Sequence, residues 1–140
     1  MPYAAFVLLV GHALVHVAYL MPAPPHPEGT PEWPFAIEKS WPIANLGVGL
    51  DIMRPVAHVL AAVVLVSLVG AGLAIIDLVV PSAWWPALAV TGATASLLLL
   101  SLFFHPWLVV GVAIDVVLLY LVLVNGWDPF AAGAALRSMA

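Results

Sequence analysis

Four long apolar runs constrain this chain more than any other feature of its sequence. They comprise residues 3–20, 55–80, 84–104 and 106–124. Each is close to the ~20 apolar residues that cross the hydrocarbon core of a bilayer as a helix. Because backbone hydrogen bonds in lipid must be satisfied within the segment, the runs are expected to be helices and not strands. The sequence therefore predicts an all-α, four-helix transmembrane bundle.

The composition agrees with a membrane location. Of the 140 residues, 65% are hydrophobic and only 7% are charged, whereas soluble domains carry about 25% charged residues. Three basic side chains are too few for a nucleic-acid surface. The absence of cysteine excludes disulfides, thiolate metal sites and iron–sulfur clusters. We expect a single domain in the cytoplasmic (inner) membrane of a bacterium, with the bilayer as partner and either a homo-oligomer or a larger membrane complex as its assembly.

The connections between the runs predict the topology. Residues 81–83 and His105-Pro106 are short links, which favours an up-down-up-down arrangement. Residues 21–51 form a long connection with seven of the thirteen prolines and with Trp33 and Trp41. We expect this Pro/Trp-rich connection to lie on the membrane surface as a partly ordered cap, and residues 126–140 to form a short interfacial tail.

Ionisable side chains inside the runs are the candidate functional residues, because a polar group in hydrocarbon costs a few kcal/mol unless it is paired. At ~1.5 Å of rise per residue, His16 and His58 lie roughly 6 Å below the face of the long connection. On the same scale His12 lies about 12 Å deep and Asp115 about 13 Å deep. The depths predict two layers, His16 with His58 above and His12 with Asp115 below, in one polar interior.

Helical spacing places further polar residues beside these layers. Three stripes share a helix face and are expected to point inward, since lipid offers them no hydrogen bond. The stripes are His12, His16 and Tyr19; Asp51, Arg54 and His58; and Thr91, Thr94, Ser101 and His105. Arg54 is expected to pair with Asp51 or to steer an anionic group. His105, Asp51 and Tyr19 are expected to support the cluster from its surroundings.

The first interpretation of the cluster is a site for Zn²⁺, iron or copper. His12, His16 and His58 would be ligands, and Asp115 a ligand or an orienting group. Such a site would serve redox or hydrolytic chemistry on a lipid-soluble substrate. Zincin-type proteolysis is not expected, because Ala13 occupies the place of the glutamate base. Haem is the related alternative, with His16 and His58 as axial ligands.

Two other interpretations remain open and need no cofactor. A His/Asp cluster inside a membrane can conduct protons, in a small transporter or an accessory subunit. The same side chains can also simply hold the helices together, at ~0.6 kcal/mol for an average interhelical hydrogen bond.

Short motifs in three regions carry a resemblance. They are Gly11-His12-Ala13-Leu14-Val15-His16, Trp33-Pro34-Phe35 with Ser40-Trp41, and His105-Pro106-Trp107 through Asp115. With them the chain resembles a group of small bacterial four-helix membrane proteins that share an N-terminal G-H-x-x-x-H motif and have no known activity. The histidine placement alone is also similar to that of four-helix haem proteins of the cytochrome b type. The resemblance implies the fold and carries no activity.

Overall fold

A computed structural model describes residues 2–25 and 27–130, and all the regular secondary structure in these residues is helical. The elements in chain order are α1 (Pro2–Val15), η1 (His16–Leu20), η2 (Ile37–Lys39), α2 (Trp41–Leu46), α3 (Leu50–Ile75), η3 (Ser82–Trp84), α4 (Trp85–Leu102), η4 (Pro106–Leu108) and α5 (Val109–Leu123). Helix α3 alone, and α1, α4 and α5 taken with the adjoining 3₁₀ turns η1, η3 and η4, are long and apolar enough to cross a membrane. The chain is therefore consistent with an integral membrane protein. Most of the expected C-terminal tail, from residue 131 on, lies outside the described residues.

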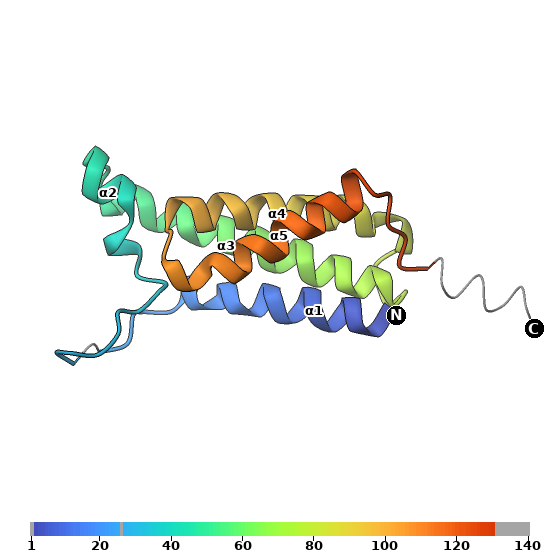
Figure 1. Cartoon of the computed structure of the whole chain (residues 1–140), viewed down its shortest axis with the longest axis horizontal. Coiled ribbons are helices and arrows are strands. Elements are labelled where there is room, and N and C mark those ends of the chain that lie inside the picture. Colours follow the sequence, from blue (N-terminus) through green and yellow to red (C-terminus); the bar gives the residue numbers. More distant parts are fainter. Residues whose placement is uncertain (1, 26, 131–140) are drawn as a thin grey trace, which may run out of the picture.

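The four long helices lie side by side, and the short α2 lies at one end of them (Figure 1). Helix α3 packs against both α1 and α4, and α4 packs against α5. Within the described residues, α1 and α5 have no contact of comparable extent. The helices therefore form an open row of neighbours, with one seam left between α1 and α5.

Glycines allow the packed helices to approach closely. A Cβ atom on Gly92 of α4 would lie 2.6 Å from the side chain of Leu68 and 3.2 Å from its backbone nitrogen. A Cβ atom on Gly72 of α3 would lie 3.2 Å from the side chains of Phe6 and Val10 on α1. Small residues of this kind let helices pack through van der Waals contact where no hydrophobic effect drives them together.

Helix α3 begins before the start expected at Pro55. It begins at Leu50, after Gly49 in an extended conformation, and the Gly49 carbonyl accepts a hydrogen bond from the Met53 amide at 3.1 Å. Met53 is buried in the core, and its burial favours the extra helical turn. Pro55 consequently lies inside the helix, where it lacks the N–H that would bond the carbonyl of Asp51.

Helix α3 also ends earlier than expected, at Ile75 and not at residue 80. Asp77 adopts a left-handed conformation with φ of 55°. Its amide bonds the carbonyl of Ala74 at 3.1 Å, and the amide of Leu78 bonds the carbonyl of Leu73 at 2.9 Å. This pair of bonds is a Schellman motif, which satisfies the last carbonyls and stops the helix. An apolar pattern carries no sign of such a stop.

Part of the connection between η1 and α3 packs against the end of the bundle. The indole N–H of Trp41 donates a hydrogen bond to the carbonyl of Ser101 at 2.7 Å. The ring of Phe35 meets that of Tyr19 edge-on, with 5.2 Å between centroids, and Ile37 is buried. These contacts fix the residues of the connection that lie next to the polar cluster.

Candidate functional site: a buried histidine, serine and aspartate network

Four buried side chains, from α1, η1, α4 and α5, form one hydrogen-bonded network. His12 Nε2 lies 2.9 Å from Oδ1 of Asp115. The Ser96 hydroxyl donates to Oδ2 of the same carboxylate at 2.5 Å, and it lies 2.9 Å from Nε2 of His16. The Nδ1–H of His16 donates to the carbonyl of His12 at 3.1 Å. The network thus ties α1 and η1 to α4 and α5.

Local structure explains why these side chains meet. His12 and His16 are one helical turn apart, so their rings share a face and stack edge-on with 5.1 Å between centroids. Ser96 lies on the face of α4 that packs inward. Gly111 lies one turn before Asp115 on α5, and a Cβ atom there would lie 3.1 Å from a methyl group of Leu100 and 3.5 Å from Cε1 of His12. The missing side chain therefore lets Leu100 pack closely against α5 beside the imidazole.

The number of hydrogens in the network is informative. Four hydrogen bonds need four hydrogens. Neutral His12 and neutral His16 supply one N–H each, Ser96 supplies one O–H, and an ionised Asp115 supplies none. If all four contacts carry a hydrogen, the network needs one proton more than neutral imidazoles and a free carboxylate provide.

The position of this additional proton is confined to one part of the network. The Nδ1–H of His16 is committed to the His12 carbonyl, because a carbonyl only accepts hydrogen bonds. If Ser96 donates to Asp115, then His16 is an imidazolium and its Nε2–H donates to Ser96. If Asp115 is a carboxylic acid, Ser96 turns its O–H to His16. In both arrangements the network carries no net charge, which lowers the cost of burying it.

The network adjoins a cavity of about 290 Å³ between α1 and α5. His12 and His16 are its polar lining residues, and Phe35 and Trp107 add aromatic rings. The Nδ1 atom of His12 has no hydrogen-bond partner among the described residues, and it is not completely enclosed by protein atoms. It is therefore the one ring nitrogen of the network that remains available to a ligand.

His58, which we expected to meet His16, joins a different part of the molecule. It is exposed on α3 and lines a second cavity, of about 460 Å³, together with Arg54 and Glu38. Arg54 pairs with Glu38 at 3.3 Å, and the expected pairing with Asp51 is wrong. Asp51 is exposed in the first turn of α3, where a carboxylate is favoured by the helix dipole.

The remaining expected neighbours also take other places. Thr91, Thr94 and Ser101 are exposed, so the expectation that their stripe points inward is wrong. His105 accepts a hydrogen bond from the amide of Trp107 at 3.2 Å and caps the short η4. Tyr19 is buried and stacks on His16 with 6.4 Å between ring centroids.

Ser96 is the member of the network that sequence reasoning missed. Ala89, Gly92 and Ala93 are buried on the same helix, and Ser96 continues their helical spacing. The signal that could have identified Ser96 is a hydroxyl on the face with the small residues, and not on the face with Thr91.

Metal and haem coordination find no support in this arrangement. Across residues 2–25 and 27–130, no group of three or more His, Asp or Glu side chains is placed to hold a metal ion. His16 uses both ring nitrogens in hydrogen bonds. Ligation by His16, with or without His58, would first require the network to be taken apart.

Comparisons with protein-family models, with curated proteins and with solved structures find no match to this chain.

Proposed function

We propose that this is a small polytopic protein of the bacterial cytoplasmic membrane, with an up-down-up-down bundle and the Pro/Trp-rich connection on the membrane surface. Its function is to hold one exchangeable proton in the His12–Asp115–Ser96–His16 network and to exchange it with a group bound beside His12. The observation that supports the proposal is the hydrogen count, which leaves one shared proton between Asp115 and His16.

The chemistry of the network suits such exchange. Ser96 can pass a proton by accepting it from one neighbour while donating its own hydrogen to the other, so the proton moves between His16 and Asp115 without moving heavy atoms. Asp115 is joined through its second oxygen to His12, whose ring lines the cavity. At its other end, the network ends with the hydrogen bond from His16 to the backbone carbonyl of His12. The network is thus a site that stores and exchanges a proton, and not a conduit across the membrane.

Nitrogen-15 NMR of histidine-labelled protein, combined with infrared difference spectroscopy, tests this proposal. We expect either a His16 imidazolium with both nitrogens protonated, or the carbonyl band of a protonated carboxylic acid that disappears in Asp115→Asn. Ser96→Ala should abolish this signal of the shared proton, whereas His58→Ala should leave the signal unchanged. Neutral histidines together with an ionised Asp115 in the wild-type protein would overturn the proposal. The same signal in Ser96→Ala would also overturn the proposal.

The same preparation tests the metal and haem alternatives. Elemental analysis and the visible spectrum of the purified protein report stoichiometric metal or a Soret band directly. Either result, lost in His16→Ala, would replace the proton-exchange proposal with a cofactor site.

A further inference from the structure

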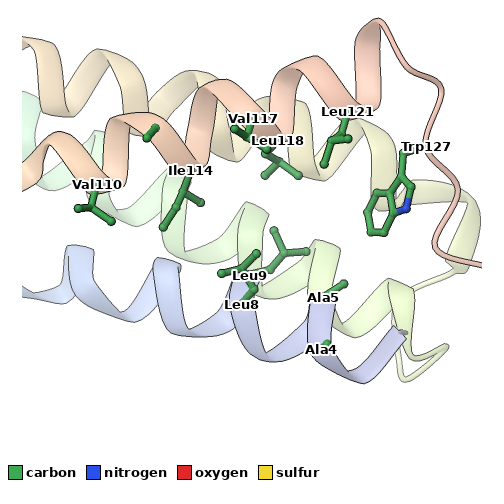
Figure 2. A pocket seen from close by; sticks show the side chains of 11 residues that line it. Ala4, Ala5, Leu8, Leu9, Val110, Ile114, Val117, Leu118, Leu121 and Trp127 are labelled. Carbon is green, nitrogen blue, oxygen red and sulfur yellow. The ribbon is translucent and has the colours of Figure 1, made fainter.

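Two neighbouring cavities, together called the groove, lie along the seam between α1 and α5, and one of them adjoins the polar network. Beside the cavity at His12 lies a third cavity, of about 510 Å³, and the two share Val110 and Ile114 as lining residues. Figure 2 shows side chains of α1 and α5 facing each other across this third cavity, with Trp127 at its far end. The cavities thus adjoin, and each is near or within the ~300–1,000 Å³ usual for ligand pockets.

The two parts of the groove differ in chemistry. The larger cavity is lined by alanine, leucine, isoleucine and valine side chains and by one tryptophan, with no ionisable residue. The smaller one presents the imidazoles of His12 and His16 and the rings of Phe35 and Trp107. A ligand that fills both must have a long apolar tail and a flat head that forms hydrogen bonds.

The head must also be uncharged. The lining of the smaller cavity contains no Lys or Arg, so a phosphate or carboxylate head would lose its water without gaining a counter-charge. This argument disfavours phospholipids and fatty acids. A neutral ring that carries oxygen atoms meets the aromatic and imidazole lining without this cost.

The Nδ1 atom of His12 determines whether a hydroxyl or a carbonyl group of the ligand is recognised. In both arrangements of the network, the Nε2–H of His12 donates to Asp115, which leaves a lone pair on Nδ1. A lone pair accepts a hydrogen bond from a hydroxyl and finds no partner in a carbonyl. We propose that the groove binds a long-chain quinol, with a phenolic O–H donated to Nδ1 of His12 and the tail along α1 and α5.

This inference rests on the proposed function for its biological meaning, because a quinol is a lipid-soluble donor of protons. The binding itself is tested independently. Purified full-length protein in nanodiscs is titrated with a quinol that carries a ten-carbon tail, with the quenching of tryptophan fluorescence as the readout. The mono- and di-O-methyl ethers and the corresponding quinone are titrated in parallel.

The quinol is expected to bind at least about tenfold more tightly (about 1.4 kcal/mol) than its di-O-methyl ether or the quinone. Equal affinities would overturn the inference, since the hydroxyl would then not be recognised. Equal binding of a simple ten-carbon alkane would overturn it too, because only the tail would matter.

Two substitutions on α5 locate the binding site. Ala113 is exposed and lines the larger cavity, whereas Val116 is exposed on the same helix and lines neither cavity. We expect Ala113→Phe to weaken quinol binding about tenfold or more (about 1.4 kcal/mol) and Val116→Phe to leave it unchanged. Equal effects of the two would overturn the site.

A second copy of the chain is the competing occupant of the groove. If Ala113→Phe converts a dimer to a monomer while quinol affinity stays the same, the groove is an interface between copies and the inference is wrong. If quinol binds but no shared proton is detected, only the proposed function is wrong. A shared proton without quinol binding would remove only this inference.

Discussion

His12 Nε2 and Asp115 Oδ1 lie 2.9 Å apart, although 103 residues separate them along the chain. Their helices otherwise leave a seam that is lined by apolar side chains. The contact is therefore the polar tie across the open side of the bundle. It places a hydrogen-bonded carboxylate, which would be costly alone in hydrocarbon, at the start of the groove.

Replacement of the carboxylate should weaken the fold measurably. Asp115→Ala leaves His12 and Ser96 without their shared partner, and a buried polar group without a partner costs about 1–3 kcal/mol. The free energy of unfolding, measured in mixed detergent micelles, should fall by that amount. Asp51→Ala is the matched control, because Asp51 is exposed and contributes only ~0.3–1 kcal/mol through the helix dipole. Equal losses in the two variants would contradict the assigned role of Asp115.

The hydroxyl of Ser96 should matter more than another hydroxyl on the same helix. Ser96→Ala removes the link between Asp115 and His16, so we expect a loss of about 1 kcal/mol in unfolding free energy. Ser101→Ala should stay within about 0.5 kcal/mol of wild type, since its side chain is exposed and its carbonyl binds Trp41 unchanged. A larger loss of unfolding free energy in Ser101→Ala than in Ser96→Ala would show that the network contributes nothing to stability.

The close approach of α3 and α4 depends on Gly92. In Gly92→Ala, the new Cβ atom would lie 2.6 Å from the Leu68 side chain and 3.2 Å from its backbone nitrogen, so the helices must separate. Overpacking of this kind costs about 1–3 kcal/mol, and thermal melting should show a lower transition temperature. Gly11→Ala provides the contrast, because nothing lies within 4 Å of a Cβ atom there. That variant should gain about 0.5–1 kcal/mol from helix propensity.

Trp41 should hold the connection against the bundle. In Trp41→Phe the ring remains, but the 2.7 Å hydrogen bond to the Ser101 carbonyl is lost. Local opening should become more frequent, and trypsin should cleave after Lys39 several times faster. For Trp84→Phe, an exposed ring for which no side-chain hydrogen bond is seen in the described residues, cleavage should match wild type. Equal rates in all three proteins would show that this bond does not anchor the connection.

Much of the helical architecture could be predicted from hydropathy, because long apolar segments in lipid have few alternatives to a helix. The ends were less predictable. Helix α3 extends beyond Pro55 because Met53 is buried, and it stops at Ile75 because Asp77 accepts a left-handed conformation. Both effects depend on local backbone bonds and tertiary contacts that a hydropathy pattern does not contain.

The candidate site was predictable only in part, for a related reason. Depth and helical register suffice to bring His12 near Asp115, since both quantities follow from counting residues. They do not fix the rotation of each helix about its own axis, and that rotation determines which other side chains point into the network. It turns His58 outward, toward Arg54, and it turns Ser96 inward in place of Thr94.

The network joins side chains from the first and the last of the four long helices, and this order has a consequence for biosynthesis. During translation, His12 and His16 enter the bilayer long before Asp115 leaves the ribosome. Until then His12 Nε2 lacks its carboxylate partner, whereas His16 can already bond the His12 carbonyl and, once α4 has been made, Ser96. The final helix supplies the acidic counterpart, so its arrival locks the nascent bundle, and a product truncated before α5 would present His12 and Ser96 without Asp115 to quality-control proteases.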